Sequence, residues 1–189
     1  MKTKTIISII LGGGLIVLLF LLTTFKPIVY LDENFNIEIK REILEFQIKS
    51  KELPVGITLD YEIEEVLFGD FTNDGIENVA VYLWKKGNYG EKMPFWVKEN
   101  DKSYKQHLFL YEKTGENKYK SIWNSSNLPY INKKTILADI DKDGLNEIAV
   151  IEQPYNAPYK NIAVWQWDDW GFENIWRSES GNFSDLKLK

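Results

Sequence analysis

Four carboxylates fall at alternate positions of one short segment. If Asp139 is position 1, then Asp141, Asp143 and Glu147 occupy positions 3, 5 and 9. Alternate positions of a tight loop aim their side chains at one centre, and calcium takes six to eight oxygen ligands. An ordinary polar turn needs only one or two acids, and four carboxylates in phase repel one another unless a counter-ion lies among them. The spacing therefore predicts a calcium site.

Other positions of this segment fit the same chemistry. Leu145, at position 7, offers a backbone carbonyl as a further ligand, and Gly144, at position 6, suits a sharp turn with positive φ. An EF-hand would need a bidentate Glu at position 12 and a helix on each side. Position 12 is Val150 and the flanks are strand-like, so we expect a calcium loop between strands. Magnesium fits less well because it demands tighter geometry and keeps its waters.

A weaker copy of the loop begins at Asp70, which precedes Asp139 by 69 residues (139 − 70). The same offset aligns Asp74 with Asp143 and Gly75 with Gly144. The predicted ligands of the first loop are Asp70, Thr72, Asp74, the Ile76 carbonyl and Asn78. Because only two of them are carboxylates, both a weak calcium site and a turn without an ion stay open.

The elements that must position these loops read as strands. Apolar runs rich in Val, Ile, Tyr, Phe and Trp flank each loop and recur twice more after it, separated by Gly, Asn, Asp and Pro. We therefore predict an all-β fold with two four-stranded antiparallel sheets, over residues 61–126 and 127–180. Residues 26–60 should add N-terminal strands, and residues 181–189 are expected to be a tail. Four antiparallel strands per unit is the plan of a propeller blade.

The loop sequences "DIDKDGLNE" (139–147) and "DFTNDGIEN" (70–78) resemble the calcium loops of FG-GAP or VCBS-type repeats, found in integrin α-subunit propellers and in exported bacterial proteins. The resemblance covers residues 61–178. It implies propeller blades with calcium in each loop, and it implies no single activity because one fold hosts many functions. Closed propellers have four to eight blades, whereas this chain shows two. An open sandwich capped by the N-terminal strands, a homo-oligomeric ring and docking to another protein all stay open.

The N-terminal segment predicts a membrane anchor. Residues 6–25 form a run of 20 residues without a charge, about the length that crosses a hydrocarbon core of roughly 30 Å. Lys2 and Lys4 precede it and favour a cytoplasmic position for residues 1–5, which places the rest outside. We expect a single transmembrane helix over 6–25. A cleaved signal peptide is the alternative, although no small-residue cleavage motif follows the run.

Two regions are candidates for contact with a partner. The long connection from residue 85 to 106 is rich in lysine and would suit an anionic wall polymer or an acidic protein, with a solvated loop as the alternative. Near the C-terminus, tryptophans on one strand face form either a binding platform or core, and Trp170 is the one expected to be exposed. The candidate partner-binding residues are Lys85, Lys86, Lys92, Trp96, Trp165, Trp167 and Trp170.

Composition excludes several classes of protein. The net charge of −5 gives no global case for nucleic-acid binding. The absence of cysteine excludes disulfides and thiolate metal sites. His107 is the sole histidine, and we expect it to face solvent from a strand. No nucleophile or phosphate-loop motif stands out. We therefore expect a calcium-binding adhesion or scaffold module at the cell envelope and not an enzyme. A carbohydrate or wall-polymer binder, or an accessory of a polysaccharide-processing enzyme, is the alternative.

Overall fold

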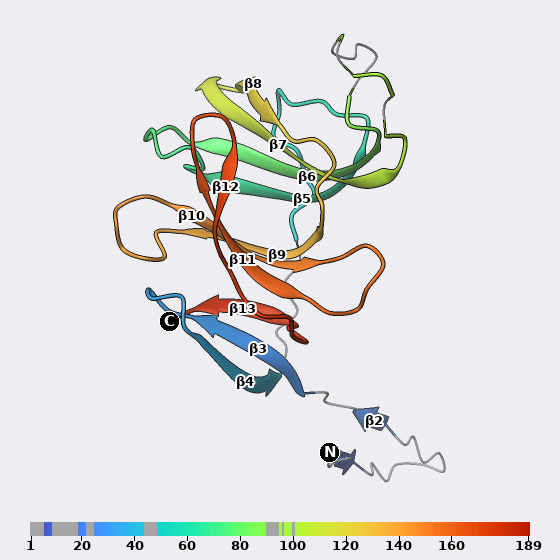
Figure 1. Cartoon of the computed structure of the whole chain (residues 1–189), viewed down its shortest axis with the longest axis vertical. Coiled ribbons are helices and arrows are strands. Elements are labelled where there is room, and N and C mark those ends of the chain that lie inside the picture. Colours follow the sequence, from blue (N-terminus) through green and yellow to red (C-terminus); the bar gives the residue numbers. More distant parts are fainter. Residues whose placement is uncertain are drawn as a thin grey trace, which may run out of the picture.

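The computed structural model describes residues 6–8, 19–21, 25–43, 49–89, 95, 97–99 and 101–189. The regular secondary structure within these residues consists of β-strands (Figure 1). The strands are β1 (Ile6–Ser8), β2 (Leu19–Leu21), β3 (Phe25–Leu31), β4 (Ile37–Ile43), β5 (Glu62–Gly69), β6 (Asn78–Lys86), β7 (Tyr104–Gly115), β8 (Lys118–Asn124), β9 (Ile131–Ala138), β10 (Glu147–Gln153), β11 (Asn161–Trp167), β12 (Phe172–Arg177) and β13 (Asp185–Leu188).

Two four-stranded antiparallel sheets form the body of the molecule. One has the order β5-β6-β7-β8 and the other β9-β10-β11-β12, so that neighbours in sequence pair as hairpins. The predicted all-β class and the predicted pair of four-stranded sheets are therefore confirmed. The inner strands β6 and β10 are buried along almost their whole length, because both faces of each sheet are covered. That burial explains their continuous apolar runs.

A third sheet of three strands, in the order β13-β3-β4, covers the far side of β9–β12. The molecule thus has three layers, with β9–β12 in the middle (Figure 1). Strand β13 runs parallel to β3 and pairs Asp185 with Ile28 and Leu188 with Leu31. The C-terminal residues 181–189, expected as a tail, therefore contribute a strand that joins the two ends of the described fold.

The middle sheet divides the core into two clusters. Successive side chains of β10 point to opposite faces. Ile148 and Val150 accordingly pack toward β5–β8, and Ala149 and Ile151 pack toward β3 and β13. A third cluster lies on the outer face of the first sheet, where residues 53–59 cover β5, β6 and β7. The loops that carry the acids lie at the ends of these buried strands, which hold them in place.

The N-terminal segment does not support the expected helix. Its described residues form β1 and β2, which pair in antiparallel register, and residues 9–18 and 22–24 lie outside the described residues. Across the part of the chain that the structure describes, no helix is both long enough and apolar enough to cross a membrane. Farther along, the N-terminal strands expected within residues 26–60 are present as β3 and β4, and residues 44–48 again lie outside the description.

Candidate functional site

The loop between β9 and β10 brings three carboxylates together. Asp139, Asp141 and Glu147 each offer an oxygen, and these oxygens lie within 4.8 Å of one another. Two oxygens that share a calcium ion at 2.3–2.6 Å can lie at most about 5 Å apart. A single ion can therefore contact all three side chains without a large rearrangement of the loop. The donor set, all carboxylate oxygen, is the kind that calcium prefers.

The backbone of this loop is shaped by two residues with positive φ. Lys142 has a φ of 64° and Gly144 a φ of 96°, and the matching positions of the first loop, Asn73 and Gly75, have 61° and 82°. Nothing lies within 4 Å of a Cβ built on Gly144, so this glycine serves backbone conformation and not space. The turn directs the Gly144 amide to the Asp139 carboxylate at 3.1 Å. The predicted sharp turn at position 6 is confirmed.

Glu147 is the unusual member of the three because its side chain is completely buried. One of its oxygens accepts the Ile140 amide at 2.8 Å, and the other accepts the Gln166 side-chain amide at 3.4 Å. Burial raises the pKa of Glu147, the Ile140 amide opposes that rise, and the neighbouring aspartates reinforce it. A bound cation would offset both the burial and the repulsion.

Asp143 lies outside the group of three converging carboxylates. Its Oδ1 accepts the Leu145 amide at 2.8 Å. Asp and Asn side chains commonly bond to the backbone amide two residues later, which stabilises a turn. The structure therefore brings together three of the four expected carboxylates, and the predicted roles of Asp143 and the Leu145 carbonyl stay predictions.

The first loop is closed by one neutral side chain and two aspartates. Asn78 stands where Glu147 stands in the second loop, and its Oδ1 accepts the Phe71 amide at 2.8 Å and the Thr72 amide at 3.2 Å. Asp70 accepts the Gly75 amide at 2.8 Å, and Asp74 in turn caps the Ile76 amide at 2.9 Å. No group of three acids converges in this loop, whose residues are all described. The second loop makes the matching backbone contacts, so the loops differ mainly in the third carboxylate, and its absence favours a first loop without an ion.

The two loops are bonded directly to each other. The Asn73 amide group donates to the Asn146 carbonyl at 3.1 Å, and the Asn146 backbone amide donates to Asn73 Oδ1 at 2.6 Å. The Asn146 side chain also donates to the Asp70 carbonyl at 3.0 Å. These contacts join the two four-stranded sheets at their loop ends. An ion that orders the second loop would therefore also steady the first.

The candidate partner-binding residues that the structure describes do not form one surface. Lys85 is buried, its ammonium donates to the Gly87 carbonyl, and burial lowers its pKa. Lys86 is exposed at the end of β6, whereas Lys92 and Trp96 lie outside the described residues. Trp170 is 91% exposed, as predicted.

The other two tryptophans face inward from β11. Trp165 borders the space between the sheets, and its Nε1 donates to Glu152. Trp167 packs edge-on against Trp123 and Phe172, at centroid distances of 6.1 and 5.3 Å. This strand face therefore lies between the sheets and does not form an exposed platform.

The expectation that His107 faces solvent is wrong. His107 lies in the middle of β7 with no exposed surface, and its Nδ1 lies 3.2 Å from the Ser125 carbonyl. Its ring packs edge-on against Phe109, on the side that residues 53–59 cover. Burial lowers the pKa of His107. The prediction failed because the surroundings of His107 include residues distant in the sequence, such as Ser125 and Lys85, which a local pattern cannot reveal.

Sequence reasoning also missed a buried charged pair. Glu152, at the end of β10, is 3% exposed and contacts Arg177 of β12. The guanidinium also lies over the Tyr130 ring, at 5.0 Å from its centroid. The signal in the sequence was a charged residue at the end of a strand that is otherwise apolar.

Comparison of the chain with family models, with curated proteins and with solved structures finds no match.

Proposed function

We propose that this chain is a calcium-binding module that acts by binding a partner and not by catalysis. The observation that carries the proposal is the convergence of the Asp139, Asp141 and Glu147 carboxylates within 4.8 Å, with Glu147 fully buried. A buried carboxylate beside two others is costly unless a cation joins them. Calcium would supply that charge, and its role would be structural.

The ion would connect the ends of two strands of the middle sheet. Asp139 follows β9 directly and Glu147 begins β10, the most deeply buried strand of that sheet. In this proposal Asp143 and the Leu145 carbonyl would complete the ligand set after a small adjustment of the loop. The first loop, with Asp70, Thr72, Asp74, Ile76 and Asn78, would stay without an ion.

The finer fold assignment rests on the loops. We infer two blades of the FG-GAP or VCBS type. Three observations support this: the ligand positions are equally spaced in the two loops, positions 4 and 6 have positive φ in both, and each sheet consists of four strands in sequence order. A module of that type would act in adhesion or as a scaffold. The partner would be an envelope protein or an anionic wall polymer, and exposed Trp170 would be one contact residue.

Calorimetric titration tests the ion itself. We expect the full chain to bind one calcium ion, with an affinity in the range of extracellular modules, about 10⁻⁴–10⁻³ M, and to bind magnesium more weakly. A stoichiometry of two would show that the first loop also binds calcium. The absence of any heat of binding at ten millimolar calcium (about ten times the weaker limit of that range) would contradict the proposal.

We further propose that residues 6–25 place this module outside the cytoplasmic membrane. The uncharged run of 20 residues and the lysines before it support this. Fractionation of cells that express the full chain should recover it in the membrane at full size. Recovery in the soluble cytoplasmic fraction would contradict anchoring, and a shorter form in the medium would indicate a cleaved signal peptide.

A further inference from the structure

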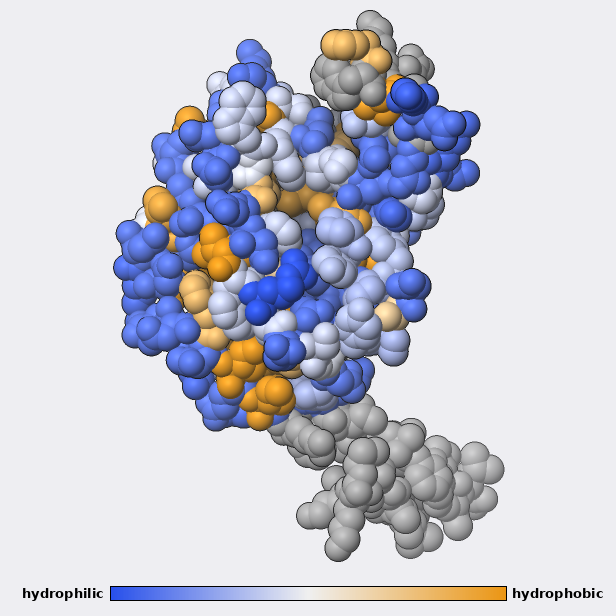
Figure 2. Space-filling model, in the orientation of Figure 1, coloured by the Kyte–Doolittle hydropathy of each residue, from blue (hydrophilic) through white to orange (hydrophobic). Residues whose placement is uncertain are grey.

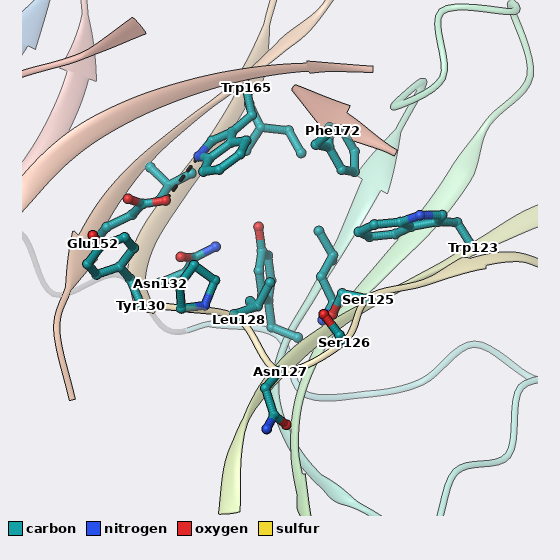
Figure 3. Close-up of a pocket in the computed structure, with 15 residues that line it drawn as sticks. Trp123, Ser125, Ser126, Asn127, Leu128, Tyr130, Asn132, Glu152, Trp165 and Phe172 are labelled. Carbon is teal, nitrogen blue, oxygen red and sulfur yellow. Dashed lines mark hydrogen bonds between the residues drawn. The ribbon is translucent and has the colours of Figure 1, made fainter. Parts of the chain in front are cut away.

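A cavity of about 210 Å³ lies between the two four-stranded sheets. Its floor comes from β6, β7 and β10, and its rim comes from the connection between β8 and β9. On the face seen in Figure 2, hydrophobic atoms lie deep in a recess between the two halves of the molecule. The close-up shows labelled side chains from both sheets arranged around one central space (Figure 3). The acidic loops take no part in it.

Aromatic rings form much of the wall. Trp165 and Phe172 approach from one sheet, Trp123 from the other, and Tyr130 from the rim (Figure 3). Aliphatic side chains, among them Leu128, complete the lining. Aromatic walls favour a flat ring as occupant because offset or edge-on ring contacts add to the energy of burial.

Two strand pairs that border this space, β11–β12 and β7–β8, have an irregular register. The register of β11 and β12 shifts between Val164 and Trp165, and that of β7 and β8 shifts between Leu110 and Tyr111. A β-bulge bends its strand and re-aims the next side chain, and such bulges are common beside binding sites. Here each bulge lies next to a tryptophan of the wall, since Leu110 pairs with Trp123.

Two residues that line this space, Tyr82 and Asn127, carry a buried polar atom without a partner in the described part of the chain, and the Asn127 amide points away from the space (Figure 3). The Tyr82 side chain is 1% exposed and lines the cavity, and its hydroxyl makes no hydrogen bond within the described part of the chain. Burial raises the pKa of Tyr82 to about 12, and the neighbouring Thr135 and Asn132 side chains oppose that rise; the Thr135 hydroxyl is itself buried without a partner. An unpaired buried hydroxyl is unfavourable, so a partner that arrives with a ligand would be stabilising.

The charged groups at the cavity are already paired. Glu152 accepts Trp165 Nε1 at 3.0 Å on one oxygen and Arg177 on the other. A charged ligand would therefore gain no counter-ion here. A sugar would bring several hydroxyls into a mostly apolar lining, and each unpaired hydroxyl would weaken binding.

We propose that this cavity binds a small neutral molecule made of one aromatic ring and one polar group that hydrogen-bonds to Tyr82. An engineered apolar cavity of about 150 Å³ holds benzene, so 210 Å³ accommodates a ring with one substituent. Phenol is the simplest molecule with this chemistry. The site is independent of the calcium loop, so the two proposals stand or fall separately.

Titration of the full chain with phenol and with benzene tests the assignment. Tryptophan fluorescence is a suitable signal because Trp123 and Trp165 border the cavity. We expect saturable binding of both, with phenol about three- to tenfold tighter, the value of one hydrogen bond. In Tyr82→Phe that preference should fall to about one. Tyr159→Phe, which removes a hydroxyl from a half-exposed ring outside the cavity, should keep it.

A second variant covers the case in which Tyr82→Phe does not fold. Leu128→Trp places a larger side chain in the cavity from its rim and should abolish binding of both rings, while its backbone bond to Gln106 remains. Failure of the wild-type chain to bind either ring saturably would overturn the proposal. So would an unchanged preference for phenol in Tyr82→Phe, or unchanged binding in Leu128→Trp.

Discussion

Calcium should stabilise the wild-type chain and leave the Glu147→Gln variant unchanged. An ion that binds only the folded state adds about 2.7 kcal/mol to the free energy of unfolding at a hundredfold excess over its Kd. Glu147 is the buried member of the three converging carboxylates, so water weakens its attraction to the ion least. Glutamine keeps the shape and can still accept the Ile140 amide. Urea unfolding with and without calcium, with magnesium in parallel, measures the difference.

The control for this experiment lies in the first loop. Asp70→Asn changes the residue that matches Asp139, in a loop that its own amides close, and it should keep most of the gain from calcium. Without calcium, Glu147→Gln should be no less stable than the wild type because it removes repulsion from Asp139 and Asp141. If Glu147→Gln keeps the full gain, the ion does not sit among these carboxylates. If it loses stability equally with and without calcium, the effect is one of packing.

The strands and the turn were predictable because their signals are local. Alternation of apolar residues and the glycine at position 6 depend on neighbours within a few residues, and they predicted β5 to β12 and the conformation of Gly144. The parallel pairing of β13 with β3 was not predictable. It joins a four-residue strand to a partner at the other end of the chain, and four residues carry too little pattern to identify.

The details of the site depend on contacts that no spacing rule contains. Asp141 and Asp143 each cap the amide two residues later, yet only Asp141 is among the carboxylates that converge, which spacing alone does not predict. The pairing of Asn73 with Asn146 crosses between units. For the same reason, the burial of His107 and the inward position of Trp165 could not be found from the sequence. Each depends on which distant parts of the chain pack against it.

Replacing Arg177 by methionine should cost about 3 kcal/mol of the free energy of unfolding at pH 7. Glu152 is 3% exposed and would keep only the Trp165 Nε1 bond. Removing one partner of a buried ion pair leaves an uncompensated charge, which typically costs 3–5 kcal/mol. We expect the lower end because the Arg177 side chain is 29% exposed. Urea unfolding at 25 °C measures the loss.

The loss should shrink as the pH falls. Burial raises the pKa of Glu152 and Arg177 lowers it, so Arg177→Met moves it further above the ordinary value of 4.5. A carboxyl whose pKa is raised by folding destabilises the fold at pH values above its unfolded pKa. At such a pH the unfolded chain has released the proton, whereas the folded chain must either keep it bound or carry a buried charge. The variant should therefore differ less from the wild type at pH 5 than at pH 7. Lys113→Met, which breaks an exposed pair with Glu77 at 3.4 Å, should change little at either pH.

Equal losses in the two variants, or a loss in Arg177→Met that does not depend on pH, would show that Glu152 is not held as a buried charge. The double variant Glu152→Gln with Arg177→Met should recover part of the stability, since it removes the orphaned carboxylate and keeps an acceptor for Trp165.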